Sequence, residues 1–455
     1  MYFVYSVFTA AGVILLSPYL LVRGMGRRQY LKNLPERMGR RFPPELSDGN
    51  AAAGLGTIWV HAVSVGEVLA ALPLARSLKQ RFGDRRLVIS TTTATGQALA
   101  RERMKFADAV FYFPLDWRGP VRRALAAVRP ALVVVFETEI WPNFLRETRQ
   151  AGTPVVFVNG RISDRSFRRF GRSLRWFGSM LRGFLRNVLA DATLYLMQSE
   201  EDAKRVLALG APAGRVVVAG NLKYDLARAE ENDLAIWLRA EIARSRRGPV
   251  LVAGSVVAGE ENAVLEALGA VEREWPDVLL VLAPRKPDRF EAAAVLVEQS
   301  GRVAVRRSGL SLDGASSGML ACGPGAPRRV LLLDTIGELA ALYGLADAVF
   351  IGGSLEPTGG HNPLEPAVAG RAPVFGPSMD NFRDMAAEFL RADAAVVVRS
   401  GAELGAAWIA LLDDADRRSR MGRAAQELVA RHRGATAATL DRLAAVLAEP
   451  HAAGS

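Results

Sequence analysis

Residues 351–366, which read IGGSLEPTGGHNPLEP, decide the fold. An apolar run of strand length, 345–351, precedes them, and residues 364–369 have the pattern of the first turns of a helix. Glycine permits positive φ and a close approach of the backbone to a ligand, and a free helix N-terminus attracts anions. We expect Asn362 to be the N-cap of this helix and Pro363 its first residue. The stretch therefore predicts an anion-binding turn, with a connection that binds nothing as the alternative.

A carboxylate, Glu365, stands in the first turn of this predicted helix. It would lie beyond the carboxyl end of a parallel strand, where open α/β sheets bind their ligands, and it can accept ribose hydroxyl groups there. The glycine spacing is neither G-x-G-x-x-G nor G-x-x-x-x-G-K-[ST]. The sequence therefore excludes the common dinucleotide and P-loop motifs.

The composition fits a two-domain protein of a reducing compartment. The chain has 455 residues, of which 50% are hydrophobic, and a single cysteine, Cys322. One cysteine cannot form an internal disulfide or a cysteine-rich metal site. The four histidines show no His-x-x-x-His spacing, which argues against a zinc site. The net charge of +11 predicts an acidic partner, such as anionic lipid, a phosphorylated substrate or nucleic acid.

The N-terminus has the pattern of a single-pass membrane anchor. Residues 1–22 carry no charged side chain and are long enough to cross a bilayer. Basic residues follow at once, beginning with Arg23, which is the reverse of the order in a secretory signal. The positive-inside rule then places the rest of the chain in the cytoplasm. A helix that packs on the protein, or lies in the membrane interface, is the alternative.

From Ile58 onward, strand-like and helix-like segments alternate, which predicts parallel sheets with helices on both faces. The first set of expected strands is 58–61, 87–91, 109–113, 131–136, 155–158 and 194–197. The second set is 250–253, 278–282, 303–305, 330–333, 348–351, 373–375 and 395–398. The fold class is therefore α/β, with two Rossmann-like domains that face each other across a cleft. Their expected bounds are 23–228 and 248–420, with a charged helical linker at 229–247 and C-terminal helices at 421–455.

Two carboxylate motifs of the first half are candidates for acid–base chemistry. Glu67 would lie in the opening turn of the first helix, where it can serve as a general base. The spacing of Ser64 and Glu67 equally fits a capping box, in which the glutamate only binds backbone N–H. Glu137 and Glu139 follow the fourth strand, and alternation along a strand predicts that they point to the same side. They can share a proton, hold a cation or pair with a basic residue.

Basic residues of both halves are candidates for anion binding. Lys223, in the motif GNLKYD, can neutralise a leaving phosphate or a substrate carboxylate. Residues 165–186 combine arginines with aromatics, which predicts a surface for membranes or phosphates, or a solvated face over an aromatic core. In the second half, Arg285 and the segments 336–338 and 362–365 all follow strands. We therefore expect them to line one crevice.

Taken together, the motifs resemble those of the 3-deoxy-D-manno-octulosonic acid (Kdo) transferases. In chain order they are HAVSVGE, ETEIWPN, NGRIS, QSEEDA, GNLKYD, AGS…GEE, APRKP, DTIGEL and GGSLEPTGGHNPLEP. The resemblance implies a GT-B glycosyltransferase, anchored at the inner membrane of a Gram-negative cell. Its implied reaction moves Kdo from CMP-Kdo to the 6′-hydroxyl of a phosphorylated lipid A precursor. The anomeric centre would be inverted, without a metal ion or another cofactor.

The resemblance also implies a role for each motif. Glu67 would deprotonate the acceptor hydroxyl, and Glu137 and Lys223 would stabilise the transition state. The first domain would bind the acceptor and the second would bind CMP-Kdo. The residues implied in binding the nucleotide are Pro284, Arg285, Ile336, Gly337, Glu338, Asn362, Pro363, Leu364 and Glu365. The expected partners are CMP-Kdo, the lipid A precursor and anionic inner-membrane lipid, and no nucleic acid.

One departure and two alternatives accompany this interpretation. Val256 and Val257 stand where relatives often have Thr-His, so this chain lacks any contact that the imidazole would make. A nucleotide-sugar epimerase with the same two domains would use a similar glycine-rich site but would need no apolar N-terminus. A non-catalytic, membrane-tethered phospholipid binder would need neither the paired carboxylates nor Glu67.

Overall fold

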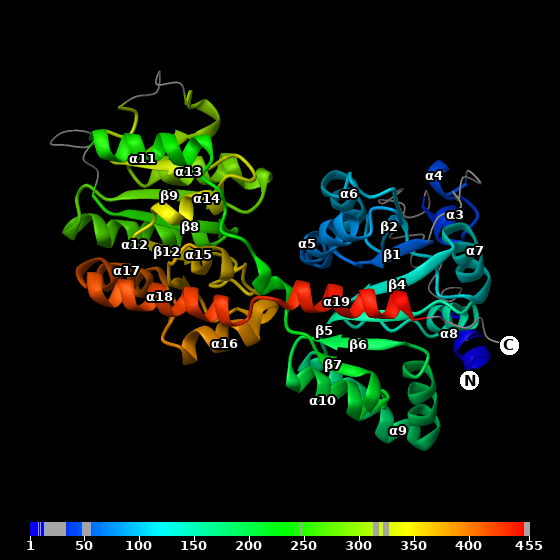
Figure 1. Cartoon of the computed structure of the whole chain (residues 1–455). Coiled ribbons are helices and arrows are strands. Elements are labelled where there is room, and N and C mark those ends of the chain that lie inside the picture. Colours follow the sequence, from blue (N-terminus) through cyan, green and yellow to red (C-terminus); the bar gives the residue numbers. More distant parts are fainter. Residues whose placement is uncertain are drawn as a thin grey trace. The chain divides into compact units, whose positions relative to one another are not determined.

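Two compact units make up the protein (Figure 1). Unit 1 comprises Met1–Asp225 and Arg433–Ser455, and unit 2 comprises Leu226–His432. The structure is a computed structural model that describes residues 1–7, 9, 11–12, 33–47, 56–245, 248–312, 318–321 and 327–449, with 47, 164–165 and 171–177 described by backbone alone. Each unit contains a parallel sheet covered by helices, so the predicted α/β class with two Rossmann-like domains is confirmed.

Unit 1 is built, within its described residues, on a seven-stranded parallel sheet in the order β3-β2-β1-β4-β5-β6-β7. Its strands are β1 (Thr57–His61), β2 (Arg86–Thr91), β3 (Ala109–Tyr112), β4 (Pro130–Phe136), β5 (Val155–Gly160), β6 (Leu194–Met197) and β7 (Val216–Val218). The order reverses between β1 and β4, and a reversal of this kind opens a crevice at the carboxyl ends of the strands. The loops after β1 and β4 are therefore where a ligand is expected.

Helices cover both faces of this sheet. They are α3 (Leu34–Arg37), α4 (Pro44–Ser47), α5 (Val65–Arg81), α6 (Ala94–Arg103), α7 (Arg118–Val128), α8 (Pro142–Gln150), α9 (Asp164–Leu189), α10 (Glu200–Leu209) and α19 (Ala435–Ala448). The apolar sides of α5, α6 and α19 pack on one face, and those of α7 to α10 pack on the other. Both faces are thus buried, which explains why the central strands are almost continuously apolar.

Unit 2 repeats this architecture with the order β10-β11-β9-β8-β12-β13-β14. Its strands are β8 (Val250–Val256), β9 (Leu279–Pro284), β10 (Val303–Arg306), β11 (Arg329–Leu332), β12 (Ala348–Ile351), β13 (Pro373–Phe375) and β14 (Val396–Val397). Its helices are α11 (Asp233–Ser245), α12 (Glu260–Glu274), α13 (Phe290–Gln299), α14 (Leu339–Leu342), α15 (Leu364–Val368), α16 (Arg383–Arg391), α17 (Gly401–Asp413) and α18 (Ala415–Arg431). The order reverses between β8 and β12, so the loops after these two strands occupy the corresponding ligand position.

The segment 229–247, predicted as a linker, is part of unit 2 instead. It contains α11, which buries Leu234, Trp237 and Leu238. These side chains recur at helical spacing and form an apolar stripe beneath the charged residues that suggested a linker. The chain passes from unit 1 to unit 2 earlier, between Asp225 and Leu226.

The C-terminal helices, predicted as one segment at 421–455, divide between the two units. Helix α18 belongs to unit 2, whereas α19 returns to unit 1 and packs against α5 (Figure 1). The carboxylate of Asp225 accepts hydrogen bonds from the N–H groups of Gly434 and Thr436, at the start of α19. A carboxylate at this position satisfies N–H groups that a helix leaves unpaired. Strand β7 was also not predicted, because it is short and only partly buried.

The predicted anchor at 1–22 lies largely outside the described residues. Of the part that is described, residues 2–7 are helical and pack on unit 1. The hydroxyl of Tyr2 donates to Asp191 at 2.5 Å, that of Tyr5 donates to Asp116 at 2.9 Å, and both rings lie against Phe184. In the part of the chain that the structure describes, no helix has the length and apolar character needed to span a bilayer.

We expect Gly422→Ala to destabilise unit 2. Gly422 lies in α18, and a methyl group there would meet the carbonyl oxygen of Gly370 at 2.2 Å. Because the obstacle is backbone, the helix must shift, and we expect the free energy of unfolding to fall by about 2 kcal/mol. Chemical denaturation of the full chain measures this change.

Gly309→Ala is the matched control in the same unit. A methyl group at Gly309 would meet nothing within 4 Å. We expect its free energy of unfolding to change by less than about 0.5 kcal/mol. Equal effects of the two substitutions would contradict the close approach of α18 to Gly370.

Candidate active site

Glu67 is the central residue of the candidate site in unit 1. It lies in the first turn of α5, directly after β1, and is 7% exposed. One carboxylate oxygen accepts a hydrogen bond from the N–H of Val63 at 2.8 Å, and the other accepts one from the hydroxyl of Ser64 at 3.0 Å. The glutamate therefore binds the N–H of the residue before the N-cap and the hydroxyl of the N-cap itself. This is not the reciprocal capping box that the spacing allowed, because the Ser64 side chain makes no cap hydrogen bond. Glu67 also stands at the reversal point of the sheet.

The surroundings of Glu67 raise its pKa to about 7. Burial is the main cause, because it disfavours the charged form. The N–H of Val63 acts in the opposite direction, and the negative charges of Glu137 and Glu139 raise the pKa further. A carboxyl group that titrates near neutral pH is well matched to accept a proton from a hydroxyl group.

Glu137 and Glu139 lie in the turn after β4, the neighbour of β1 in the sheet. The N–H of Glu137 donates to the carbonyl of Val158 at 2.9 Å, and Glu137 has φ of 55°, which is uncommon outside glycine. Because β4 ends at Phe136, strand alternation does not govern this pair as predicted. They are close nevertheless, since burial and then the charge of Glu137 raise the pKa of Glu139.

Lys223 brings positive charge to these carboxylates. Its Nζ lies 4.0 Å from Oε1 of Glu137. Burial lowers the pKa of Lys223, whereas the charges of Glu137 and Glu67 act to raise it. Of the three possibilities that the sequence left open for the glutamate pair, the structure shows a basic partner for Glu137.

Polar side chains of the motifs NGRIS, QSEEDA and GNLKYD, for which no role was predicted, hold the Lys223 segment. Asn159, near the end of β5, is 1% exposed, and its Oδ1 accepts from the N–H of Leu222 at 3.0 Å. The Nε2 of Gln198 donates to the carbonyl of Asn159 at 2.9 Å, and the Nδ2 of Asn221 donates to Oε1 of Gln198 at 3.0 Å. In the sequence, this network could have been found from the Asn or Gln that recurs at the ends of neighbouring strands.

A reciprocal pair of hydrogen bonds joins the Glu137 turn to the turn after β5. The hydroxyl of Thr138 donates to the carbonyl of Arg161 at 2.6 Å, and the N–H of Arg161 donates to that hydroxyl oxygen at 2.9 Å. The positive charge of Arg161 contributes to the lowered pKa of Lys223. Unit 1 thus brings Glu67, Glu137 and Lys223 together.

The candidate nucleotide site of unit 2 centres on Arg285. Its N–H, directly after β9, donates to the carbonyl of Val256 at 2.8 Å, and its side chain is exposed. Burial raises the pKa of Glu365 and lowers that of His361 to about 4, and the charge of Arg285 lowers both. Arg285 and Glu365 are therefore neighbours, as predicted. His361, which was not predicted to belong to this site, joins them.

The start of α15 differs by one residue from the prediction. Pro363 occupies the N-cap position, and Asn362 precedes it. Asn362 still satisfies the backbone: its Oδ1 accepts from the N–H of Leu364 at 3.1 Å, and its Nδ2 donates to Glu365 at 3.4 Å. An Asn side chain that binds the N–H two residues later forms a turn of its own, so the helix begins one residue later.

The segment 336–338 was predicted to bind the nucleotide, but the side chain of Glu338 is already bound by residues of unit 2. Arg307 donates to one carboxylate oxygen of Glu338 from Nε at 3.0 Å and from Nη2 at 2.9 Å, and the hydroxyl of Thr335 donates to the other. Ile336 is 60% exposed, and Gly337 has φ of 98°. The Glu338 side chain is therefore bound within unit 2, which leaves the backbone of this segment and Ile336 as its accessible parts.

The glycine-rich turn is not the open anion site that the sequence predicted. The N–H groups of Gly353, Ser354 and Leu355 donate to the carboxylate of Glu260 at 2.7, 2.8 and 2.9 Å. Glu260 is the first residue of α12 and is 1% exposed. A carboxylate of the protein itself fills the concavity that successive N–H groups form, so a ligand phosphate needs other donors.

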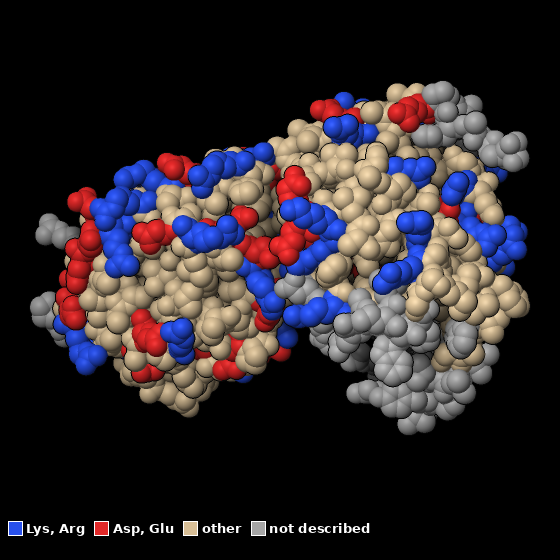
Figure 2. Space-filling model, turned by 90° about the horizontal axis from the view of Figure 1, so that it is seen from below, with Lys and Arg blue, Asp and Glu red and all other residues tan. Residues whose placement is uncertain are grey.

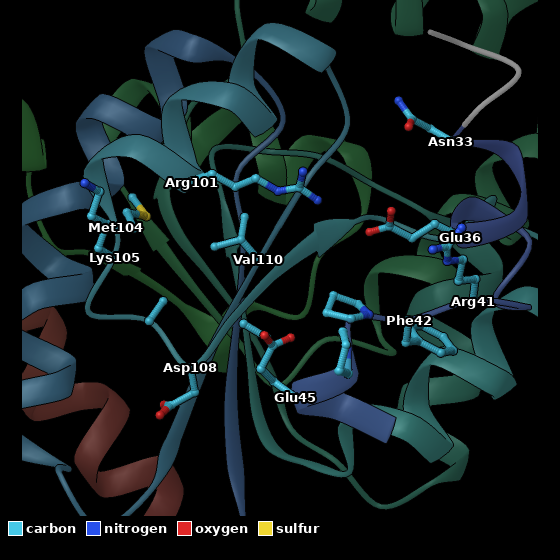
Figure 3. Close-up of a pocket in the computed structure, with 14 residues that line it drawn as sticks. Asn33, Glu36, Arg41, Phe42, Glu45, Arg101, Met104, Lys105, Asp108 and Val110 are labelled. Atoms are coloured by element: carbon cyan, nitrogen blue, oxygen red, sulfur yellow. The ribbon is translucent and has the colours of Figure 1, made fainter. Parts of the chain in front are cut away.

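A cavity of about 560 Å³ in unit 1 is separate from these residues (Figure 3). The edge of β3, the end of α6 and the segment after residue 32 form its wall. Charges of both signs line it, with Arg41 and Arg101 set against Glu36 and Glu45. Because none of the predicted residues lines it, we do not assign it to the active site.

Comparison with known proteins points to one family. Residues 32–226 match the family model described as 3-deoxy-D-manno-octulosonic-acid transferase (kdotransferase). The chain is 34% identical to the 3-deoxy-D-manno-octulosonic acid transferase of Haemophilus influenzae, over 85% of this chain and 86% of that protein. It is 36% identical to the protein of the same name from Bordetella pertussis, over 90% and 89% of the two chains.

A solved structure agrees on the fold. The glycosyltransferase from Rickettsia africae superposes with a TM-score of 0.54 at 11% identity and covers 87% of this chain and 99% of its own. At this identity the likeness concerns the fold alone. The two sequence relatives, by contrast, are similar over nearly their whole length. On that evidence the chain belongs to the 3-deoxy-D-manno-octulosonic acid transferases, a family of glycosyltransferases.

Proposed function

We propose that this transferase moves Kdo from CMP-Kdo to the 6′-hydroxyl of a phosphorylated lipid A precursor, with inversion of the anomeric carbon. The observation that carries the proposal is the cluster in unit 1, where Glu67, with a pKa of about 7, lies near the Glu137–Lys223 ion pair. Membership of a transferase family removes the support for the two alternatives, an epimerase and a non-catalytic binder.

In this proposal Glu67 is the general base. Its carboxylate takes the proton of the acceptor hydroxyl while the hydroxyl oxygen attacks the anomeric carbon of Kdo. The bond from that carbon to the phosphate oxygen breaks, and CMP leaves with the electron pair. Attack from the face opposite to the leaving group inverts the anomeric centre.

Glu137 and Lys223 would stabilise the transition state. Positive charge develops on the sugar ring as the bond to phosphate breaks, and negative charge develops on the departing phosphate. A carboxylate suits the first charge and an ammonium group suits the second. A monophosphate leaves with less charge than a diphosphate, so Lys and Arg side chains can take the place of a metal ion. We therefore propose a reaction without a metal ion or another cofactor.

Unit 2 would bind the cytidylate part of the donor. The exposed guanidinium of Arg285 suits the phosphate, and the carboxylate of Glu365 suits the ribose hydroxyl groups. The charge of Arg285 acts to lower the pKa of Glu365, so the two side chains are close enough to contact one ligand. Glu338 would take part through its backbone, since Arg307 holds its side chain. The full proposed set is Pro284, Arg285, Ile336, Gly337, Glu338, Asn362, Pro363, Leu364 and Glu365.

We propose that the enzyme acts at the cytoplasmic side of the inner membrane, with residues 1–22 as its attachment. Helix α9 packs its aromatic side chains toward the core of unit 1; these are Phe167, Phe170 and Phe184. Its described arginines at the surface are Arg168, Arg169, Arg182 and Arg186. On the face seen in Figure 2, blue side chains predominate over red ones on the described surface of unit 1, while both colours intermingle on unit 2. Exposed positive charge suits anionic lipid and the phosphates of the acceptor.

Glu67→Gln is expected to lower kcat for Kdo transfer by about 10²- to 10⁴-fold, because a general base is lost. Glutamine keeps an oxygen that can accept from the N–H of Val63, so the start of α5 should persist. Binding of CMP should stay within twofold of the parent. Product formation from CMP-Kdo and lipid A precursor by mass spectrometry, with CMP calorimetry, tests both expectations.

Glu403→Gln is the matched control for capping. Glu403 follows Ser400 at the same spacing, and its carboxylate accepts from the N–H of Arg399 at 2.9 Å, as Glu67 accepts from Val63. It should leave transfer unchanged. Transfer by Glu67→Gln at the rate of the parent would reassign Glu67 to capping alone.

The pH dependence of kcat/KM should show an acid limb near pH 7. The pKa of Glu67 is raised, and the base acts only when deprotonated, so activity is present above about pH 7 and lost below it. Below that point we expect roughly a tenfold fall per pH unit. A limb near the ordinary pKa of a glutamate, or a flat profile, would contradict the proposed environment of Glu67.

Lys223→Ala should act on turnover rather than on donor affinity. Losing the ammonium group is expected to lower kcat by about 10²- to 10³-fold, with CMP affinity within twofold of the parent. Lys79→Ala is the control, because Lys79 lies in the same unit but pairs with Asp108 at 2.7 Å. A loss of CMP affinity without a loss of kcat would reject the proposed role.

A further inference from the structure

Glu260 has an unusual environment for a buried carboxylate. Besides the three N–H groups of the glycine-rich turn, it accepts a hydrogen bond from the N–H of Val257 at 3.0 Å. Four backbone donors thus converge on one side chain, and among the described residues no cationic side chain pairs with it. Hydrogen bonds from backbone N–H groups to an ionised acceptor are among the stronger kinds in proteins. Glu260 therefore restrains the position of the backbone segments whose N–H groups it binds.

The glycine-rich turn packs so closely against Glu260 and its neighbours that a side chain larger than hydrogen does not fit at Gly352 or Gly353. A methyl group at Gly352 would meet the carbonyl oxygen of Ser255 at 2.5 Å and Oε2 of Glu260 at 2.8 Å. One at Gly353 would meet the ring of His361 at 2.8 Å, and Gly353 has φ of 69°. Glycine is required at both positions, because any side chain would push the turn away from Glu260.

One oxygen of Glu260 connects the two segments that carry the candidate nucleotide-binding residues. Oε2 accepts both from Val257, directly after β8, and from Gly353, after β12. On the first side, the neighbouring carbonyl of Val256 holds the N–H of Arg285 at 2.8 Å. Both of these contacts use backbone atoms of Val256 and Val257. They therefore do not depend on whether the side chains are Val-Val or the Thr-His of relatives.

On the second side, the turn is connected to the residues before α15. The carbonyl of Gly353 accepts from the N–H of Gly360 at 2.6 Å and from the hydroxyl of Thr358 at 2.8 Å. The chain then continues directly into His361 and the segment 362–365. The position of Gly353 thus determines where this segment begins.

We propose that Glu260 is a positioning residue for the donor: through backbone hydrogen bonds it holds Arg285 and the segment 362–365 in the arrangement that binds the nucleotide. This proposal rests on the assignment of these residues to CMP-Kdo. A carboxylate is required because it only accepts hydrogen bonds, whereas an amide would place its own N–H₂ group against backbone donors.

Glu261 provides a matched comparison. It is the next residue of α12 and is also 1% exposed. Its carboxylate accepts from the guanidinium of Arg289 at 2.8 Å and from the N–H of Gly259 at 3.0 Å, and not from the glycine-rich turn. A substitution at Glu261 therefore disturbs a buried acid of the same helix turn without releasing the turn itself.

The test compares Glu260→Gln and Glu261→Gln in the full chain. For Glu260→Gln we expect the Kd for CMP and the KM for CMP-Kdo to rise at least tenfold, with kcat within threefold of the parent. Amide hydrogen exchange across 353–365 should be at least tenfold faster. For Glu261→Gln we expect CMP affinity and exchange in 353–365 to stay within twofold of the parent, even if its melting temperature falls.

Three results would overturn the proposal. They are CMP binding by Glu260→Gln within twofold of the parent, unchanged exchange across 353–365, or an equal loss of affinity in Glu261→Gln. A parent protein that does not bind CMP would instead reject the donor assignment, and with it the role of Glu260. If Glu260→Gln does not fold, Glu260→Asp, which keeps the charge but withdraws it by one methylene, is measured in its place with the same expectations.

Discussion

Buried carboxylates that bind backbone N–H groups organise the carboxyl ends of the strands in both units. Glu67 follows β1 and Glu260 follows β8, and each strand lies at the point where the order of its sheet reverses. A buried charge is costly unless hydrogen bonds replace water, and each such bond to an ionised group contributes about 1.5–3 kcal/mol. The two side chains thus hold the loops that surround each candidate site.

The number of donors separates the roles that we assign to these two carboxylates. Glu67 accepts from one backbone N–H and one hydroxyl, and burial raises its pKa to about 7. Its carboxyl group therefore remains available for proton transfer. Glu260 accepts from four backbone N–H groups, so its oxygens are occupied. The arrangement of Glu67 suits proton transfer, and that of Glu260 suits the positioning of the glycine-rich turn.

Much of the architecture could be read from local patterns. Every expected strand is present, because buried parallel strands are short apolar runs between turn signals. The two errors in the domain bounds share a physical cause. Helix α11 buries Leu234, Trp237 and Leu238 within unit 2, whereas α19 packs on unit 1. The pattern of an amphipathic helix does not indicate which core the helix will cover. Strand β7 is too short to show a period.

For the site, residue types and their order in the chain were sufficient to identify the family and to name Glu67, Glu137, Lys223, Arg285 and Glu365. These are local properties, since a motif needs only neighbouring residues. Which carboxylate stays reactive depended on long-range packing. Gly353 lies 93 residues beyond Glu260 in the chain, yet its N–H donates to that side chain. Only folding brings such donors together, and for this reason the glycine-rich turn encloses an acid of the protein rather than an open anion site.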